Sequence, residues 1–312
     1  MISATREAAR IDPELTRLLA CPMCRSGLAE ESASLQCEAC ATAYEIRDGI
    51  PLLLVETDDH KQRQVGFFDE ETDPEFEIGR PFGAPPLYRR LMEEKFRRAV
   101  AGLERFLAAE PALVVCGGSG MDAELLARAG ARAITSDISL GAALRAQERA
   151  QRRGLPVWSI VADAERLPFR DRSIPLVYVH DGLHHLERPL NGVAEMARVA
   201  RVAVTVTEPA DAAITRVAVR FGLALAREDA GNVVARLTLA EIEHALEREG
   251  FETVGAERYA MYYRHEPGRG VRALSATGLA RPGQAAWRAA NAVVGRFGNK
   301  LSVRAARAGE AR

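Results

Sequence analysis

Apolar segments alternate with helix-like segments through the second half of the chain, and this alternation restricts the fold more than any other feature. It predicts strands at 112–116, 132–136, 157–161, 175–180 and 202–207, with helices at 121–130, 140–153 and 189–200. Strands and helices in this order form a parallel sheet with helices on both faces. The sequence therefore predicts an α/β fold with a Rossmann-like sheet.

The chain beyond residue 207 is predicted to complete this sheet. We expect a helical insertion near 211–227, a helix at 238–249 and a strand at 252–263. Residues 264–312 hold ten Lys+Arg and two acids, a local charge of +8, which could indicate a basic tail. Apolar residues alternate there, which favours a closing strand after a helix around Trp287; they are Leu301, Val303 and Ala305.

Four of the five cysteines fall in two Cys-x-x-Cys pairs, which are the most specific metal signal in the chain. Twelve residues separate Cys21 and Cys24 from Cys37 and Cys40. Two such knuckles place four thiolates at the corners of a tetrahedron, the geometry of structural zinc. Because the protein supplies all four ligands, no position remains for a reactive water. We therefore expect zinc to stabilise a small N-terminal unit and to take no part in chemistry.

The segment around these cysteines resembles the Trm112-like zinc ribbons that accompany methyltransferases. The resemblance covers about residues 15–55 and includes Cys-Pro-x-Cys, the second knuckle and the ending Asp-Gly-Ile-Pro-Leu-Leu. We expect a zinc-ribbon domain at 1–56, with a short amphipathic helix in its first twenty residues. Residues 57–110 are predicted to be a linker and leading helix, and 111–312 the main domain. Within the linker, 56–86 should have little regular structure, and a helix should run from 88 to about 107.

A glycine-rich turn follows the first strand of the predicted sheet. It reads Cys116-Gly117-Gly118-Ser-Gly120, and a helix begins directly after it. Glycines let the backbone approach a ligand closely, and a helix N-terminus offers unpaired N–H groups to a carboxylate or phosphate. Gly118-x-Gly120-x-x-Ala123 also satisfies the dinucleotide fingerprint. A nicotinamide-dependent oxidoreductase is therefore one candidate.

Acidic residues close the next two strands. Asp137, followed by Ile138, stands seventeen residues after Gly120, where a carboxylate can accept both hydroxyls of a ribose. NAD and S-adenosylmethionine both carry that ribose, so Asp137 does not distinguish them. Asp163 and Ala164 open the segment Asp-Ala-Glu-Arg-Leu-Pro-Phe after the third strand. The fourth strand ends in polar groups, namely His180, Asp181, His184 and His185.

In this order the motifs resemble class I S-adenosylmethionine-dependent methyltransferases of the UbiE-like type (methyltransferase type 11), over roughly residues 88–306. The resemblance implies S-adenosylmethionine as cofactor. It implies that Asp163 binds the exocyclic amine of adenine and that Ala164 gives a backbone contact to the ring. The implied cofactor-binding residues are Cys116, Gly117, Gly118, Gly120, Asp137, Ile138, Asp163, Ala164 and His180.

The glycine turn departs from this family pattern at two positions. Val114 stands where the family usually has an acid, and Cys116 replaces the first glycine. Without that carboxylate, the methionine ammonium group has to be held by Asp122 or by backbone carbonyls of the turn. We interpret Cys116 as a packing residue at the strand end rather than a nucleophile.

The reacting centre should lie beyond the carboxyl ends of the strands. Methyl transfer to oxygen or nitrogen needs in-line positioning and a group that takes the proton, for which Asp181, His184 and His185 are candidates. Their spacing also resembles the Glu-x-x-Glu-His arrangement with which some quinone O-methyltransferases hold a divalent cation. Alternatively, His185 packs under the sheet and His184 caps the turn. Candidate substrate contacts are Phe76, Arg80, Tyr88, Asn232, Tyr262, Tyr263, Arg264 and His265.

Together these features predict a zinc ribbon joined to a methyltransferase that acts on oxygen, nitrogen or activated carbon of a small molecule. An RNA-modifying methyltransferase or RNA-binding module is one alternative, although the net charge of −1 and the lack of aromatic-interleaved basic clusters argue against nucleic acid. A NAD-dependent oxidoreductase and a degenerate fold without cofactor are others. The charged first twenty residues and the lack of a long apolar run predict a cytoplasmic protein without a membrane span. The oligomeric state is left open.

Lysine is rare in this chain. Lys61, Lys95 and Lys300 are the only three among 42 Lys+Arg, which leaves 42 − 3 = 39 arginines. We attribute this imbalance to coding bias and give it no functional weight.

Overall fold

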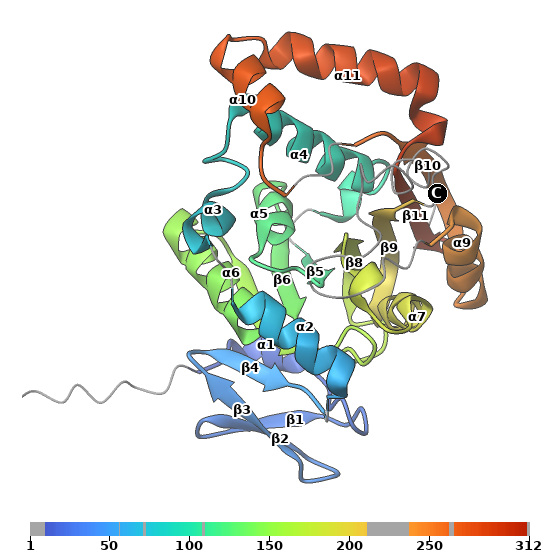
Figure 1. Ribbon diagram of the computed structural model, residues 1–312. Helices are drawn as coiled ribbons and strands as arrows, with labels where there is room; N and C mark the ends of the chain where they lie inside the picture. Colours follow the sequence, from blue (N-terminus) through green and yellow to red (C-terminus); the bar gives the residue numbers. More distant parts are fainter. Residues whose placement is uncertain are drawn as a thin grey trace, which may run out of the picture.

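The structure is a computed structural model that describes residues 10–55, 57–70, 73–107, 110–210, 237–261 and 265–310. Its centre is a sheet of five parallel strands (Figure 1). They are β5 (Pro111–Val115), β6 (Arg132–Asp137), β7 (Val157–Ala162), β8 (Ile174–His180) and β9 (Ala200–Pro209). All five predicted strands are confirmed to within two residues at each end.

The strand order in this region is β7-β6-β5-β8-β9. The order of the strands reverses between β5 and β8, and in doubly wound sheets ligands bind beyond the carboxyl ends of the strands at such a point. Two antiparallel strands, β11 (Lys300–Arg307) and β10 (Phe251–Tyr259), extend the sheet past β9. The predicted closing strand is thus confirmed, and the basic-tail alternative does not hold for it.

Helices cover both faces of the sheet because successive residues of each strand point to opposite sides. In β5, Leu113 and Val115 belong to one buried cluster, whereas Ala112 and Val114 belong to another. The first cluster is covered by α7 (Pro189–Val199) and α9 (Leu239–Arg248), the second by α4 (Pro86–Ala99) and α5 (Met121–Arg128). The helix α6 (Leu140–Arg153) packs on β6 and β7. The predicted α/β class is therefore confirmed.

The N-terminal ribbon continues this sheet at its other edge. It contains α1 (Pro13–Leu18) and four short strands, which are β1 (Leu28–Glu31), β2 (Ser34–Cys37), β3 (Ala43–Arg47) and β4 (Ile50–Leu53). The strand β4 pairs in parallel with β7 through Leu52 and Leu53. Leu15 and Leu19 of the ribbon share one buried cluster with Phe169 of the main sheet region. The ribbon and the sheet thus pack through a common core, and the domain boundaries at 56 and 110 stay predictions.

The segment 56–86 is where the sequence prediction was wrong. It contains two helices, α2 (Asp59–Asp69) and α3 (Pro74–Gly79), where little regular structure was expected. The next helix, α4, ends at Ala99, and a short 3-10 turn at Glu104–Phe106 follows. Both new helices begin with aspartate caps, Asp58 and Asp73, whose carboxylates accept backbone N–H groups of the first turn.

Two further helices, α10 (Arg269–Ala276) and α11 (Ala280–Val294), lie on α4 as an outer layer (Figure 1). The expected helix around Trp287 is therefore confirmed, and α11 leads through a short 3-10 turn, Gly295–Phe297, to β11. The expected strand at 252–263 ends at Tyr259. The expected insertion at 211–227 lies outside the described residues. In the described part of the chain, no helix has the length and apolarity needed to cross a bilayer.

Candidate functional site

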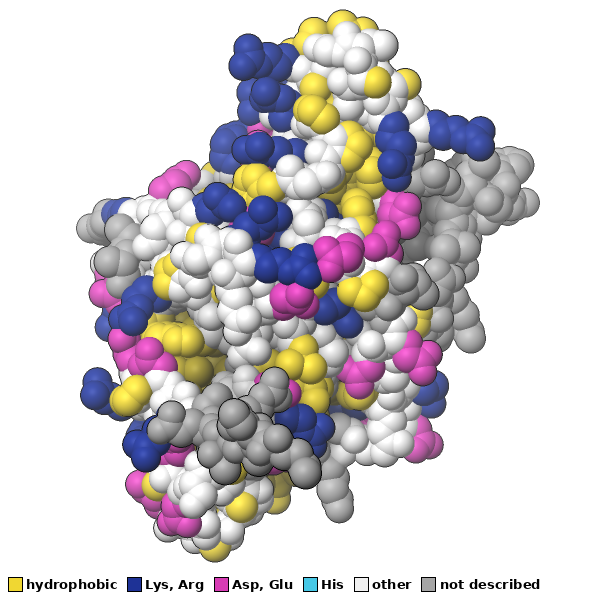
Figure 2. Space-filling model, turned by 90° about the vertical axis from the view of Figure 1, so that its left-hand side faces the viewer, with side chains coloured by type: hydrophobic (Ala, Val, Ile, Leu, Met, Phe, Trp, Pro, Cys, Tyr) yellow, Lys and Arg dark blue, Asp and Glu magenta, His cyan; other side chains and the backbone are white. Residues whose placement is uncertain are grey.

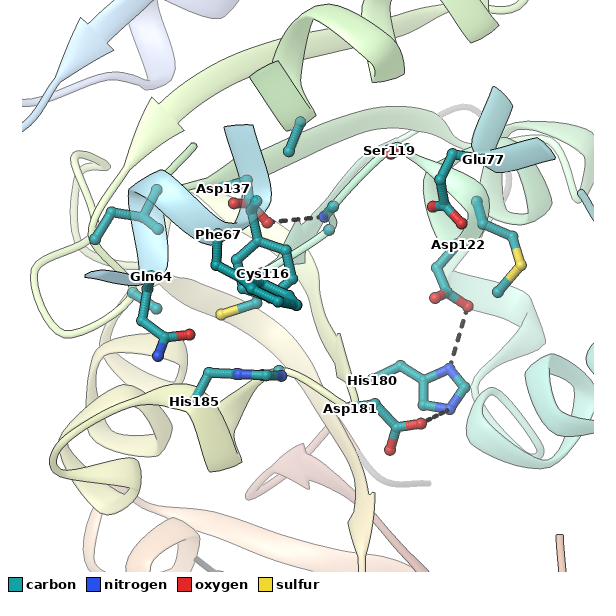
Figure 3. Close-up of a pocket in the computed structure, with 18 of the residues that line it drawn as sticks. Gln64, Phe67, Glu77, Cys116, Ser119, Asp122, Asp137, His180, Asp181 and His185 are labelled. Atoms are coloured by element: carbon teal, nitrogen blue, oxygen red, sulfur yellow. Dashed lines mark hydrogen bonds and ion pairs between the residues drawn. The ribbon is translucent and has the colours of Figure 1, made fainter. Parts of the chain in front are cut away.

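A cavity of about 940 Å³ opens at the carboxyl ends of β5, β6, β7 and β8. Ligand pockets usually measure about 300–1,000 Å³. Its walls come from strand ends, from α4 and α5, and from the two unexpected helices α2 and α3. Figure 3 shows Gln64 of α2, Glu77 of α3 and Asp122 of α5 around the cavity. Of the twelve residues predicted for cofactor binding and catalysis, eleven line this cavity. Gly120 is the exception, because it is buried at the end of the glycine turn.

The glycine turn exposes backbone atoms, without side chains, to the cavity. Gly117 has to be glycine because a Cβ atom there would lie 2.0 Å from the Thr135 hydroxyl oxygen. Gly120 begins α5 with a φ of 78°, and a Cβ atom on it would lie 2.8 Å from the Cβ of Ala146. Gly118 has open space around it and donates its N–H to Oδ2 of Asp137 at 2.8 Å. The turn is thus packed tightly against β6 and α6 and open on the cavity side.

Two arginines of α6 support this turn, and sequence reasoning missed both. Arg149 is 1% exposed, and it donates to the carbonyl of Ser119 at 2.6 Å and to Glu124 at 2.9 Å. Arg145 donates to the Ser119 hydroxyl at 3.0 Å and to the carbonyl of Phe68 in α2 at 2.6 Å. These charge-assisted bonds fix the turn and connect it to α2.

Asp137 ends β6 and its carboxylate is held by backbone N–H groups. Oδ2 accepts from Gly118 and Oδ1 accepts from Ser139 at 3.0 Å. Burial raises the pKa of Asp137, while these N–H groups act in the opposite direction. A carboxylate offers about four lone-pair sites, so these backbone donors leave room for ligand hydroxyls.

Asp163 follows β7, and its carboxylate faces α2. Oδ1 accepts the backbone N–H of Glu165 at 2.9 Å, and Oδ2 pairs with Lys61 Nζ at 2.7 Å. Lys61 also lies 3.1 Å from Oε2 of Glu165. The helix α2 is thereby connected to the end of β7 by a half-buried ion pair.

The end of β8 holds a row of buried polar groups, visible in Figure 3. His180 Nδ1 lies 3.3 Å from Oδ1 of Asp122, and Nε2 lies 3.5 Å from Oδ2 of Asp181. Tyr178 donates its hydroxyl to Asp122 at 2.9 Å. Burial, and after it the charge of Lys95, lowers the pKa of His180. His180 is therefore neutral near pH 7, between two carboxylates.

Asp181 is the centre of a second charged group. Lys300, which is 1% exposed, forms a short ion pair with its Oδ1, and Lys95 Nζ lies 3.3 Å from Oδ2. Although burial acts against ionisation, the two ammonium groups hold the pKa of Asp181 well below its usual range. A carboxylate with so low a pKa is a poor proton acceptor at neutral pH.

The two adjacent histidines differ in their surroundings. His184 is 3% exposed, and its Nδ1 lies 2.8 Å from Oε2 of Glu208. The other oxygen of Glu208 accepts the N–H groups of Gly182 and Leu183 at 2.9 and 2.7 Å. Glu208, not His184, therefore caps the turn. His185 lines the cavity wall, stacks edge-on against Phe68 with ring centroids 5.3 Å apart, and accepts a bond from His60 at its carbonyl.

All three lysines of the chain lie at this site. Lys61 and Lys95 line the cavity, and Lys300 lies behind Asp181. Sequence reasoning missed them because it attributed the arginine excess to coding bias. In a chain that uses arginine almost everywhere, the few lysines were a usable signal, since lysine offers a compact point charge that the larger planar guanidinium does not.

The remaining walls come mostly from α3, α4 and the segment before α10. Among the candidate substrate contacts, Phe76, Arg80, Tyr88 and His265 line the cavity. Asn232, Tyr262, Tyr263 and Arg264 lie outside the described residues. Glu77 is buried, yet its hydrogen bond with His265 and the charge of Arg80 lower its pKa to about 2.

Cys116 lies at the cavity wall in a left-handed conformation, with a φ of 53°. Burial raises the pKa of its thiol well above the usual value, and the charge of Asp137 adds to this. The thiol is therefore protonated at neutral pH, which agrees with the interpretation of Cys116 as a packing residue rather than a nucleophile.

The four paired cysteines form a cluster in the ribbon. Their Sγ atoms all lie within 4.8 Å of one another. The distances are 3.7 Å for Cys21 and Cys40 and 3.4 Å for Cys24 and Cys37. A tetrahedron with zinc–sulfur bonds of about 2.3 Å has edges of about 3.8 Å. Backbone N–H groups of Ala39 and Cys40 point at the Cys37 sulfur, which suits a thiolate.

Comparison with known families agrees with this arrangement. The methyltransferase domain family matches residues 113–204, and the Trm112p-like protein family matches residues 12–49. The demethylmenaquinone methyltransferase of Thermobifida fusca is 32% identical over 113 residues, which are 35% of this chain and 47% of that protein. A UPF0434 protein of Nitrosococcus oceani is 48% identical over 48 residues, 15% of this chain and 81% of that protein. The chain spans about half the length of the demethylmenaquinone methyltransferase.

Solved structures share the fold. Magnesium protoporphyrin IX methyltransferase from Synechocystis, solved with bound SAH, aligns with a TM-score of 0.55 at 18% identity, over 80% of this chain and 100% of that one. The [4+2]-cyclase SpnF aligns with the same TM-score and identity over 84% of this chain and 99% of that one. At this identity the likeness concerns the fold alone, and the chemistry has to come from the site.

Proposed function

We propose that this chain is a UbiE-like class I S-adenosylmethionine-dependent methyltransferase with a Trm112p-like unit ahead of that domain, and that it transfers a methyl group from S-adenosylmethionine to a small molecule. One observation carries the proposal. Asp137 and Asp163 end neighbouring parallel strands, and both line the cavity that the glycine turn opens.

In this proposal Asp137 accepts both ribose hydroxyls through the lone pairs that Gly118 and Ser139 leave free. Asp163 accepts the adenine amine, with Ala164 beside the ring. The methionine part lies along the glycine turn. Val114 supplies no acid there, and we assign the ammonium group to Asp122, whose pKa stays low despite burial because His180 lies beside it. Bound S-adenosylmethionine supplies an electrophilic methyl group next to the acceptor.

On the acceptor side, apolar walls face a group of charges. Phe76, Tyr88 and Met92 line one side, and Lys95 and Asp181 close the end near β8. We assign orientation of the acceptor to Asp181, since its low pKa makes it a poor base. His184 is the stronger candidate for proton acceptance, because Glu208 at Nδ1 fixes the tautomer in which Nε2 is basic. An acceptor with an apolar body and one oxygen, nitrogen or activated carbon nucleophile fits these walls.

We further propose that zinc binds Cys21, Cys24, Cys37 and Cys40. The sulfur distances fit a tetrahedral site, and all four ligands come from protein. The role of this zinc is to hold the ribbon, and with it β4, in place.

Isothermal calorimetry with S-adenosylhomocysteine tests the cofactor proposal. Each of Asp137→Ala and Asp163→Ala should weaken binding by at least about 10-fold, because one charge-assisted hydrogen bond contributes about 1.5–3 kcal/mol and Asp137 is proposed to accept two. Asp171→Ala, an exposed acid away from the cavity, serves as control and should bind like wild type. NADH should give no heat. Unchanged affinity in both cavity variants, or tight NADH binding, would refute the placement of the nucleoside.

A further inference from the structure

The outward face of α11 is apolar, although it faces solvent. Its inner face packs through Ala280, Gly283, Trp287 and Asn291, a helical spacing of three and four. Apart from Arg281 and Arg288 at its sides, the exposed positions of this helix are small or apolar: Pro282, Ala285, Ala286, Ala289, Ala290, Ala292 and Val293. A surface helix normally carries charged and polar residues on its outer face. Here the outward face consists of small and apolar residues.

Larger exposed hydrophobic side chains gather around this helix. Val293 is 75% exposed and Phe297 is 60% exposed. Leu274, Leu279 and Val294 are exposed as well, so five of the nine exposed large hydrophobic residues found in the described part of the chain lie between 274 and 297. Clusters of this kind mark interaction sites, whereas single exposed residues do not.

The charged residues within the segment that forms this face are all of one sign. Residues 267–300 contain no acid and five arginines, which are Arg269, Arg272, Arg281, Arg288 and Arg296. Arg288 pairs with Glu94, and Arg272 lies 3.9 Å from Glu266. Within the described residues, Arg269, Arg281 and Arg296 form no ion pair. Figure 2 shows dark-blue side chains beside yellow ones at the end of the molecule that holds α10 and α11.

The occupant of this face therefore has to be apolar and anionic at once. A second copy of the chain would bring arginines against arginines across a two-fold axis, which is unfavourable. A bilayer with anionic headgroups meets both demands: small apolar side chains enter the headgroup boundary, and flanking arginines reach the phosphates. We propose that the face formed by α10, α11 and Phe297 docks on the surface of anionic phospholipid bilayers.

The position of this face is compatible with docking of the whole protein. In Figure 1, α11 lies along one end of the molecule, on the side of α4 that points away from the sheet. A bilayer can therefore lie along α11 without covering the ribbon. Because α11 is held by α4 and β11 is paired on both sides, docking requires no unfolding.

Vesicle sedimentation with the full chain tests this proposal. We expect binding to phosphatidylcholine vesicles that contain about one third phosphatidylglycerol, little binding to phosphatidylcholine alone, and weaker binding as salt is raised. Arg281→Ala with Arg296→Ala should weaken binding about 30-fold, since each arginine near an anionic surface contributes about fivefold. Arg63→Ala with Arg188→Ala removes the same charge from exposed sites elsewhere and should have little effect.

Charged substitutions in the apolar centre of the face give a second test. Val293→Asp with Phe297→Asp changes two exposed side chains, so folding is retained, and binding should be lost. Leu190→Asp, which is also exposed and lies on α7, is the matched control and should bind like wild type. Equal binding to neutral and anionic vesicles, or no binding at low salt, would overturn the proposal. So would a dimer in analytical ultracentrifugation that Val293→Asp dissociates, because the face would then be covered by a second copy.

Discussion

Single charged residues decide much of the site, and Asp181 shows this most clearly. Its φ of 54° is unusual for a residue with a side chain, although aspartate tolerates it better than most. Its carboxylate lies between Lys95 and Lys300, on the end of the strand where the acceptor is proposed to bind. No periodicity in the sequence could bring Lys300 to Asp181, because the two are 119 residues apart and meet only when β11 pairs with β9.

The first prediction concerns this ion pair. Asp181→Asn removes the carboxylate partner of a lysine that is 1% exposed, so the free energy of unfolding should fall by about 3–5 kcal/mol. The double variant Asp181→Asn, Lys300→Met should recover part of that loss, because Lys300 then leaves no buried charge, although Lys95 still lacks its carboxylate partner. Urea denaturation measures both. Glu75→Gln, which breaks an exposed ion pair with Arg152, should change stability by less than about 0.5 kcal/mol. Equal losses in the single and double variants would contradict this account.

The second prediction concerns His180 and pH. Burial lowers its pKa in the folded protein below the ordinary value of 6.5. As pH falls through about 6.5, the unfolded chain binds a proton that the folded chain does not bind, so stability falls. The loss continues down to the folded pKa, with a slope of at most about 1.4 kcal/mol per pH unit from this group. His180→Gln should flatten the slope between pH 7.5 and 5 in urea titrations. Parallel slopes for the two proteins would show that His180 does not cause the acid sensitivity.

Among whole elements, those of the sheet could be predicted from sequence, and α2 could not. Buried strands such as β8 are apolar throughout, which makes them visible in the sequence. The inner side of α2 faces the cavity with the polar residues His60, Lys61 and Gln64 in its first turns and carries Phe67 and Phe68 only at its end, so its apolar spacing is too short to indicate a helix. Asp58 could have indicated the start of this helix, but the surrounding segment contains many acids, so a single capping aspartate does not stand out from its neighbours. Tertiary contacts, not the apolar period, therefore stabilise this helix.

The third prediction follows from that cap. Asp58 accepts the N–H of Lys61, and loss of an N-cap costs about 0.5–2 kcal/mol of helix stability. Because α2 covers the cavity and pairs with Asp163, Asp58→Ala should speed the dissociation of S-adenosylhomocysteine by about 2- to 30-fold. Asp59→Ala, one residue further and not the cap, is the matched control. A ligand-chase experiment measures the rates, and identical rates for the two variants would mean that α2 does not hold the cofactor.

At the scale of the whole molecule, the ribbon and the cavity are parts of one sheet. The site motifs of the strands were predicted together because each strand end carries its own polar residue, as Asp137 and Asp163 do. The position of the ribbon was not predicted, since parallel pairing of Leu52 with Val161 depends on two backbones meeting and leaves no pattern in either segment. The strand β7 thereby has β4 on one side and β6 on the other, and Asp163 follows it directly.

The fourth prediction uses this continuity. Purified protein should contain one zinc per chain, released when a mercurial reagent blocks the thiols, and Cys40→Ser should lose it, whereas Cys116→Ser should retain it. Loss of zinc frees the ribbon, and β4 is then no longer held against β7, only a few residues before α2 begins. Lys61 lies on α2, and Asp163 directly follows β7. Because the ion pair between them connects these two elements at the cavity, affinity for S-adenosylhomocysteine should fall about tenfold or more, that is by about 1.4 kcal/mol. If the metal-free protein binds the cofactor as well as the zinc form does, the structure of the ribbon does not affect cofactor affinity, although the ribbon and the cavity share one sheet.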